Sequence, residues 1–460
     1  MESFFKRYFK GDYVIWVIYV LLIMFSVSVL YSAGSSLDTS EFINHIIFLI
    51  VGFIALMTVY HLPREWTKRI AFIMLAFAFA MQVMAYTSLG SADHRRIFIF
   101  QPSELIKFAL IVITAFYIDK FQNPDYLQKY FKWFLWIVCL PLILITPSNL
   151  SMGLIILTPI ITMMMIGAVP WKKIGLLIGI LIVVFIVACS ISYPLYNVRE
   201  DNNKRSELVQ ALADNNIMKN TFYKLRVHTW TNRVSTWNSN NSASTQEDIM
   251  KDEQAERAQC AIHDGKLTAA GPGNSFWRNH IEQIWSDYIF ALIVEEYGLI
   301  GAMIIIWLFL CLLWRAGILV RYSETVYSSI VIVGAATVII LQAFVHIAVC
   351  TRLLPATGQP LPLISKGGTS ILITSIFFGL LLRMSREVNY VEKKVVEKDN
   401  QNDKSDNDIS NNLIFEDKKE NSVEISDISE IKEDKNDVIL EDFIDISADD
   451  QLAETTEIKI

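Results

Sequence analysis

The sequence predicts an all-α polytopic membrane protein with about ten transmembrane helices. Three observations predict this class: 53% of the 460 residues are hydrophobic, only 19% are charged, and long apolar runs recur along most of the chain. Most runs come close to the roughly 20 residues that an α-helix needs to cross the hydrocarbon core of a bilayer. So apolar a composition excludes an ordinary soluble protein. Membrane lipids are the expected surroundings, and no nucleic-acid partner is expected.

Charge is divided unevenly between the membrane body and the end of the chain. The net charge is −7, but residues 391–460 hold 22 acidic and 9 basic side chains, so the rest of the chain carries +6. An acidic segment without a sustained apolar face is predicted to be a disordered cytoplasmic tail. Short apolar pieces around Ile414 and at 438–440 leave partner binding open, although a solvated tail is the favoured interpretation.

The first predicted element follows a basic segment, residues 1–12, which we expect in the cytoplasm. Because further spans follow the first apolar run, we interpret that run as a retained helix rather than a cleaved signal peptide. The separation of two later spans at 147–149 stays open, since one long broken helix would show the same pattern. The expected spans are 13–33, 42–62, 69–87, 103–121, 130–146, 150–169, 173–194, 287–314, 326–351 and 369–385.

Basic residues in the short loops predict that both termini lie in the cytoplasm. Between the seventh and eighth spans, residues 195–286 form a large extracytoplasmic loop with a predicted surface helix near 254–262. A loop of this length is usually functional or disordered, and this one leads directly to Asp287. Four basic residues are exceptions to the inside bias, because they fall in short loops on the outer side: Arg95, Arg96, Arg352 and Lys366.

Asp287 stands at the head of the eighth predicted span, and Glu295 and Glu296 follow within it. An ionised group in hydrocarbon is costly and is expected only where it faces a cavity, a partner or a substrate. Eight residues of helix would separate Asp287 from Glu295 by roughly 12 Å, with Glu295 deeper, which does not suit a paired-carboxylate glycosidase. We therefore predict a single base, Asp287, with Glu295 and Glu296 as structural or tuning groups. Taken alone, Asp287 is more typical of a helix N-cap.

Two further segments place polar residues at membrane depth. Glu104 and Lys107 lie three residues apart at the start of the fourth span, so they share one helix face. A structural ion pair and a polar cavity for an anionic substrate are equally compatible with this spacing.

Residues 354–370 contain three prolines and three glycines, which cannot continue a helix. Gly367 and Gly368 either offer backbone N–H groups to an anion or belong to a plain re-entrant loop.

Long motifs connect these residues to a known family. Taken together, they resemble the SEDS family, the polytopic peptidoglycan polymerases that include FtsW, RodA and SpoVE. The motifs are Gln101–Lys107, Gln259–Ser275, Ser286–Gly301 and Leu354–Ser370, in the family's order. The resemblance covers about residues 10–390, and we expect 13–390 to form one SEDS-like transmembrane domain. Four shorter stretches are closest to the cell-division member FtsW: 9–16, 271–275, 295–298 and 357–360.

The resemblance implies a glycosyltransferase that polymerises lipid II into glycan strands on the outer face of the cytoplasmic membrane, for septal synthesis in cell division. In that family, the aspartate at the position of Asp287 is the proposed catalytic residue. A divalent cation, Mg²⁺ or Mn²⁺, would share phosphate contacts, but neither the sequence motifs nor the five scattered cysteines predict a metal site. The candidate substrate-binding residues are Arg95, Arg96, Glu104, Lys107, Arg352, Ser365, Lys366, Gly367 and Gly368.

The resemblance also implies the partners. These are lipid II, undecaprenyl-pyrophosphate-linked glycan, a class B penicillin-binding protein acting as transpeptidase, and other division proteins. The chain departs from the family pattern where Arg96, Arg352 and Lys366 add positive charge on the outer side and His346 replaces a common asparagine. A RodA-like elongation polymerase, a lipid II flippase or other transporter, and a non-enzymatic scaffold remain as alternatives.

Overall fold

The computed structural model describes residues 11–32, 39–85, 100–146, 149–200, 246–266 and 269–388, with no side-chain environment for 187–200 and 246–252. The chain divides into two compact units, Met1–Lys393 and Lys394–Ile460. Arg95, Arg96 and the tail 391–460 lie outside the described residues. The architecture below is therefore that of the described part of the first unit.

Every expected span overlaps a helix. By length and composition, seven helices of the described part are able to cross a membrane, and Leu150–Ile166 is a shorter apolar helix. The helices are α2 (Tyr13–Ser32), α3 (Thr39–His61), α4 (Arg64–Ala85), α5 (Pro102–Phe121), α6 (Pro124–Ile145), α7 (Leu150–Ile166), α8 (Trp171–Glu200), α12 (Gln246–Gly265), the 3₁₀ turn η2 (Trp277–Asn279), α13 (Ile289–Arg321), α14 (Val326–Cys350) and a final helix, Gly368–Val388. The protein is an all-helical multi-pass membrane protein.

Local signals set several helix starts. Proline occupies the first helical position of α5 and α6, where its missing N–H leaves no hydrogen bond unmade. The Asn149 side chain accepts from Met152 N at 3.3 Å and caps α7. This cap makes α6 and α7 two separate helices, which resolves the alternative of one long broken helix.

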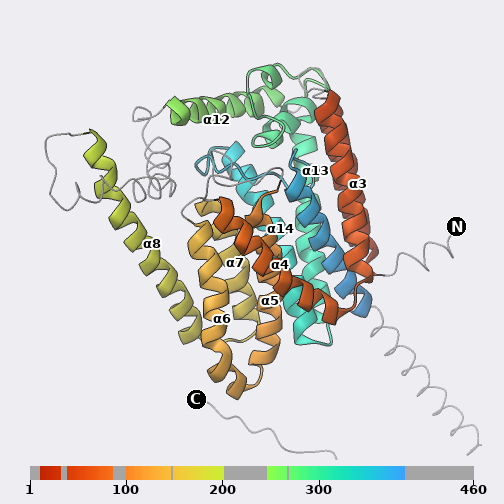
Figure 1. Cartoon of the computed structure of the whole chain (residues 1–460). Helices are drawn as coiled ribbons and strands as arrows, with labels where there is room; N and C mark the ends of the chain where they lie inside the picture. Colours follow the sequence, from red (N-terminus) through yellow and green to blue (C-terminus); the bar gives the residue numbers. More distant parts are fainter. Residues whose placement is uncertain are drawn as a thin grey trace, which may run out of the picture. The chain divides into compact units, whose positions relative to one another are not determined.

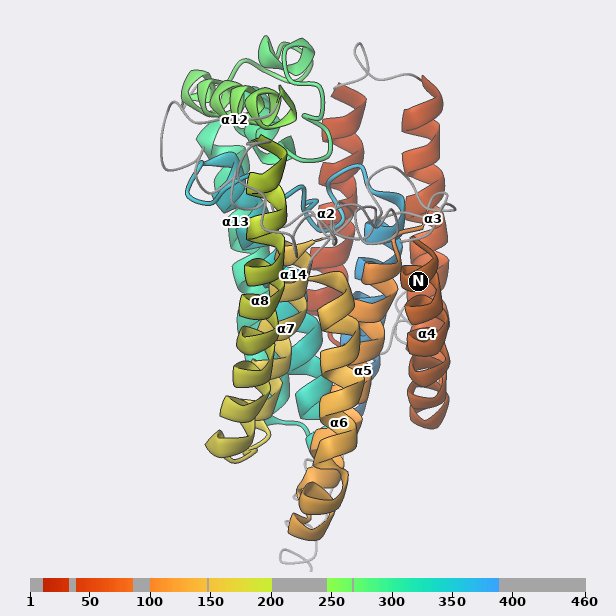
Figure 2. The ribbon, with the colours of Figure 1, turned by 60° about the vertical axis from the view of Figure 1, so that its left-hand side comes forward.

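The most buried helices form the centre of the bundle. In the apolar windows of α14 and the final helix, 72% and 78% of the residues are buried, against 22% in α3 and in α4. α5 joins this centre, because fifteen of its residues are buried, including Glu104 and Lys107. α3 and α4 lie at the periphery (Figure 2), where exposed apolar side chains suit contact with lipid.

The two ends of the bundle differ. α12 lies across one end (Figures 1 and 2), hereafter the α12 end. At the opposite end, Arg315 pairs with Asp12 at 2.5 Å. Arg64 there pairs with Glu387 and donates to Ser328 at 2.7 Å. These contacts hold the ends of α2, α4, α13, α14 and the final helix together. That the opposite end faces the cytoplasm stays a prediction from the distribution of basic residues.

α13 is broken at Gly298, where φ is 69° and ψ is −173°. The continuous span expected at 287–314 is therefore wrong: a short piece, 289–297, precedes the break, and a longer piece, 299–321, follows it. The long piece runs antiparallel to α2, since Glu296 contacts Ser32 near one end and Arg315 pairs with Asp12 near the other. Only glycine adopts this backbone conformation without strain.

The segment after α12 supplies the hydrogen bonds that the break removes. Leu299 N donates to Lys266 O at 3.0 Å, Ala270 N to Glu295 O at 2.9 Å and Gly271 N to Glu296 O at 3.1 Å. Backbone N–H and C=O groups at membrane depth need such partners, because no water is available there to form the hydrogen bonds instead. The break therefore pairs the backbone of Lys266, Ala270 and Gly271 with the helix that follows Asp287.

We expect Gly298→Ala to lower the melting temperature of the purified protein, because a Cβ at this φ costs about 1–3 kcal/mol. Gly317→Ala is the matched control. It lies in the same helix with open space around its Cα, so the substitution is expected to be neutral or slightly stabilising. Equal melting temperatures for the two variants would show that the break is not a fixed part of the fold.

Candidate active site

Asp287 lies in the turn that precedes α13, not at the helix cap. The N-cap position is Tyr288, and its side chain makes no capping hydrogen bond. Asp287 N donates to Gln283 O at 2.9 Å, and the Ser286 hydroxyl donates to Asp287 Oδ1 at 3.1 Å. The helix-cap interpretation of Asp287 is thus wrong. Its half-buried carboxylate is instead oriented by the turn that holds it.

The proline-rich segment 354–367 is irregular, as its sequence predicts, and it packs against this turn. Lys366 N donates to Trp285 O at 2.9 Å, and the Ser365 hydroxyl donates to Ser286 O at 2.9 Å. Ser365 is buried and its oxygen also accepts from Leu361 N at 2.7 Å. Two motifs that are far apart in the sequence therefore meet at the residues immediately before Asp287.

Gly358 brings the same segment against the carboxylate itself. A Cβ at Gly358 would lie 3.4 Å from Asp287 Oδ2, and its φ of +65° is one that glycine adopts readily. Behind it, His346 Nδ1 lies 2.8 Å from Gln359 O, and the Cys350 thiol lies 3.8 Å from Asp287 O. The backbone around Asp287 is thus held by α14 as well as by the proline-rich segment.

Two buried polar atoms beside Gly358 have no hydrogen-bond partner within the described residues: Thr357 Oγ1 and Gln359 Oε1. The amide nitrogen of Gln359 is 3.5 Å from Asn149 Oδ1. Unpaired buried acceptors of this kind mark places where water or a ligand binds. Sequence reasoning missed both residues, although polar side chains flanking the glycine of a proline-rich segment were a usable signal.

Glu104 and Lys107 form a buried ion pair, with Nζ and Oε2 2.7 Å apart and both side chains 1% exposed. Lys107 also donates to Gln342 Oε1 at 2.8 Å, and Gln342 Nε2 donates to Pro360 O at 3.0 Å. The sequence predicted only that the two side chains share one helix face. In the structure, Gln342 links the pair to the proline-rich segment by hydrogen bonds. A lone glutamine in an apolar helix was the sequence signal for that link.

The two described basic residues that the sequence predicts on the outer side each have an acidic partner. Arg352 pairs with Glu256 of α12 at 3.2 Å, and Lys366 pairs with Glu41 of α3 at 2.7 Å. The Lys366 ammonium also lies 5.8 Å from the centre of the Trp285 ring. Both basic side chains remain partly exposed, so another anion could exchange with either carboxylate.

Gly367 and Gly368 lie where the irregular segment gives way to the final helix. Gly367 O accepts from Ile371 N at 2.9 Å within the first turn. A Cβ at Gly368 would come within 2.6 Å of the Phe48 ring, so α3 packs directly on this backbone. A packing requirement thus accounts for Gly368, whereas anion binding by these N–H groups stays a prediction.

Glu295 and Glu296 hold the loop that follows α12. Glu295 accepts from the Ser275 hydroxyl at 2.5 Å, Phe276 N at 2.7 Å and Trp277 N at 3.2 Å. Glu296 accepts from the Ser32 hydroxyl and from Gly273 N. Both carboxylates are buried, and a buried charge with several donors is far less costly than one without. Their contacts agree with a structural task.

The depth order expected for these acids is reversed. Glu296 contacts Ser32, the last residue of α2, whereas Ile364, next to Ser365, accepts from Ser26 at 3.1 Å. Six residues of helix correspond to roughly 9 Å, so the Asp287 turn lies further from the α12 end than Glu296 does. The expectation failed because it assumed a continuous helix descending from Asp287.

The described residues include no group of three or more His, Cys, Asp or Glu side chains suited to a metal. A divalent cation therefore remains a prediction without a donor set to support it.

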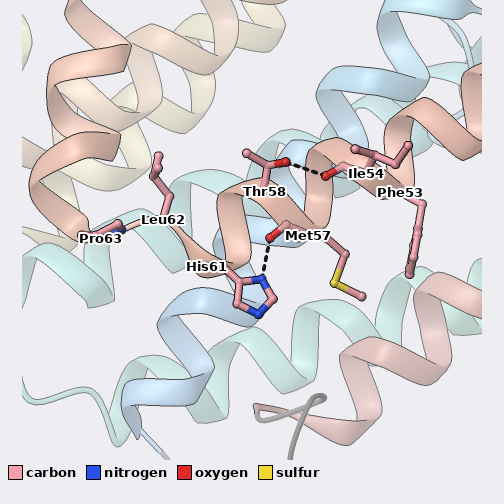
Figure 3. A pocket seen from close by; sticks show the side chains of 7 residues that line it. All are labelled: Phe53, Ile54, Met57, Thr58, His61, Leu62 and Pro63. Atoms are coloured by element: carbon pink, nitrogen blue, oxygen red, sulfur yellow. Dashed lines mark hydrogen bonds between the residues drawn. The ribbon is translucent and has the colours of Figure 1, made fainter.

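One open pocket lies on α3, lined by Phe53, Ile54, Met57, Thr58, His61, Leu62 and Pro63 (Figure 3). Thr58 and His61 hydrogen-bond carbonyls of their own helix there. This pocket has no part in the Asp287 site.

Residues 9–390 match the model of a family of cell cycle proteins that comprises FtsW, RodA and SpoVE. This chain belongs to that family. The match takes in every segment that meets at Asp287, including the proline-rich segment and the broken helix.

Named relatives agree with this membership. Probable peptidoglycan glycosyltransferase FtsW of Halomonas elongata is 24% identical over 366 residues, 76% of this chain and 83% of that protein. Its namesake in Geobacter sulfurreducens is 26% identical over 402 residues, 83% of this chain and 96% of that protein. Stage V sporulation protein E of Bacillus subtilis is 36% identical over 133 residues, 27% of this chain and 36% of that protein.

Solved structures share the fold. Rod shape determining protein RodA of Thermus thermophilus superposes with a TM-score of 0.53 at 17% identity, covering 82% of this chain and 97% of that chain. A chain from a peptidoglycan synthase complex, reported for coordination of polymerization and crosslinking, superposes with a TM-score of 0.58 at 17% identity. That match covers 82% of this chain and 98% of the other.

We expect Glu295→Ala to loosen the loop at 275–278, because two backbone N–H groups and a hydroxyl lose their acceptor, at a cost of about 3 kcal/mol. In Glu295→Gln the remaining oxygen still accepts from both N–H groups, and Ser275 accepts from the new amide. The glutamine variant is therefore expected to lose only about 1 kcal/mol. Hydrogen exchange at 275–278 measures the difference. Equal protection in all three proteins would contradict the structural task.

Proposed function

We propose that this protein is a peptidoglycan glycosyltransferase that polymerises lipid II on the outer face of the cytoplasmic membrane. The observation that carries the proposal is the half-buried carboxylate of Asp287, fixed where two family motifs meet. The names of the FtsW relatives support the same activity. Those relatives, together with the FtsW-like stretches of the sequence, favour septal synthesis over elongation.

Asp287 is proposed as the general base. It takes the proton of a sugar hydroxyl on the acceptor, whose oxygen then bonds to the anomeric carbon of the growing strand. The bond from that carbon to the pyrophosphate breaks, and undecaprenyl pyrophosphate leaves with the bonding electrons. Base catalysis of this kind contributes about 10²–10⁴-fold to a rate. The Ser286 hydroxyl on Oδ1 orients the carboxylate, and Oδ2 lies on the Gly358 side.

Lys366 and Arg352 are proposed to contact the substrate phosphates. Each is within ion-pair distance of one acid, Glu41 or Glu256, and each is partly exposed. An incoming pyrophosphate offers more charge than one carboxylate, so it competes well for these cations. Arg95 and Arg96 are proposed for the same task from their sequence position. Lys107 is fully buried, and we propose that it supports the site through Gln342 instead.

The cellular setting follows from the same proposal. Both termini are placed in the cytoplasm by the basic residues of the loops, and the division septum is the proposed location. A class B penicillin-binding protein is the proposed partner, with other division proteins around it. The likeness to a chain of a peptidoglycan synthase complex supports a partner of that kind.

One observation favours a second candidate, a lipid II transporter. Broken helices at membrane depth are typical of transporters, and α13 is broken at Gly298. Backbone groups of Lys266, Ala270 and Gly271 satisfy the break in this structure. A transporter would move labelled lipid II across a vesicle bilayer without forming polymer, which separates it from a polymerase.

We expect Asp287→Asn to lower the rate of polymerisation of purified lipid II by at least about 100-fold, because the amide does not accept the proton. The variant should fold, since it is isosteric and the backbone contacts of the turn remain. Glu282→Gln, an exposed acid of the same turn, is the control and should polymerise normally. Near-normal synthesis by Asp287→Asn would refute the proposed base.

Lys366→Gln is expected to raise KM for lipid II about tenfold, which corresponds to roughly 1.4 kcal/mol, with a smaller change in kcat. The loss of one charge-assisted contact to phosphate is the physical reason. Lys172→Gln at the exposed start of α8 is the control. Steady-state kinetics at a fixed ionic strength measure the effect. An unchanged KM would exclude Lys366 from substrate binding.

A further inference from the structure

We propose that Phe276, Trp277 and His280 form a binding site for the product glycan strand at the α12 end. These three residues are called the aromatic platform below. The proposal rests on the proposed polymerase activity and adds to it a place where the strand is held outside the catalytic turn. None of the three residues takes part in the site built around Asp287.

The platform exposes aromatic rings outside the bundle. Phe276 is 64% exposed, and its ring stacks on the imidazole of His280 with 4.5 Å between centroids and 23° between planes. Trp277 meets both rings edge-on, at 5.3 Å from Phe276 and 5.9 Å from His280. Phe276 and His280 are thus the exposed rings of the cluster, and partly buried Trp277 packs against the core beneath them.

Partly buried and exposed hydrogen bonds hold these rings in place. Glu295 accepts from Phe276 N and Trp277 N. His280 Nδ1 lies 2.9 Å from Phe276 O, and Arg257 donates to His280 O at 2.7 Å. A surface aromatic without a task needs no such support. Rigid rings lose little conformational entropy on binding, which favours them at recognition surfaces.

Polar groups surround the rings. The Trp277 indole N–H donates to Asp264 Oδ2 at 2.8 Å and is the main cause that holds the pKa of that carboxyl below its usual value. Within the described residues, His280 Nε2 has no hydrogen-bond partner, and the neighbouring Asn279 is exposed. A flat apolar face edged by donors and acceptors matches a sugar ring, which carries C–H groups on its faces and hydroxyl or amide groups at its rim.

The position of the platform singles out the strand among possible occupants. Phe276 N is bonded to Glu295, which lies in the short helix 289–297 that follows the Asp287 turn. Because Glu295 is nearer the α12 end than the Asp287 turn, the platform lies on the outward side of the proposed base. A strand leaving that base toward the α12 end therefore meets the platform within a few sugar units.

The test measures strand binding separately from synthesis. Lipid-free, uncrosslinked glycan strands are titrated into the full-length protein carrying Asp287→Asn, which removes turnover. Phe276→Ala in that background should weaken strand binding at least fivefold, and Phe276→Trp, which keeps a flat ring, should restore it. Trp171→Ala removes a 71% exposed aromatic from the start of α8 and should bind strands like the parent.

Each outcome decides one question. Equal strand affinity with and without the Phe276 ring overturns the platform. A loss of vesicle or transpeptidase binding in Phe276→Ala, with strand affinity intact, overturns it too and assigns the rings to lipid or to a protein. Polymerisation by the protein with its native Asp287 is measured in parallel. Its absence would refute the proposed function, whereas strand binding still reports on the platform.

Discussion

Every backbone polar group at membrane depth needs a hydrogen-bond partner, and the break at Gly298 is where this constraint shapes the rest of the molecule. The carbonyls of Glu295 and Glu296 take backbone donors from 270–271, and Leu299 N reaches Lys266 O. Because α12 ends at Gly265, directly before Lys266, these bonds also hold α12 at the end of the bundle. The short piece 289–297 is then held in place, and Asp287 comes directly before it.

The charges of the described bundle fall into two physical classes. Fully buried ones have protein partners: Glu295 accepts from several donors, and Glu104 and Lys107 pair with each other. Removing one partner is costly. Partly exposed pairs, such as Lys366 with Glu41, are weakly coupled and easily exchanged. The first class maintains architecture, whereas the second is free to serve an anionic ligand.

Hydropathy alone located the spans, because a bilayer demands length and apolarity that are visible in a single sequence. It missed the break, since Gly298 stands in an apolar run where a glycine is ordinary in a helix. Because the break was missed, the depth of Glu295 relative to Asp287 was predicted wrongly. The start of the helix was also misplaced, so Asp287 was interpreted as its cap. Gln342 and Gln359 were missed because their importance lies in contacts between distant segments. Asp287 itself was recognisable from charge cost and family motif together.

The two helix starts near Asp287 have an electrostatic consequence. The short helix 289–297 begins immediately after Asp287, and the final helix begins at Gly368, beside the segment bonded to Trp285 and Ser286. Each helix amino end carries a partial positive charge from its aligned peptide dipoles. Two such ends converge on one turn, as the half-helices of transporters do around anions. Main-chain dipoles thereby make the electrostatic potential at this turn more positive, and their partial charges do not change with pH.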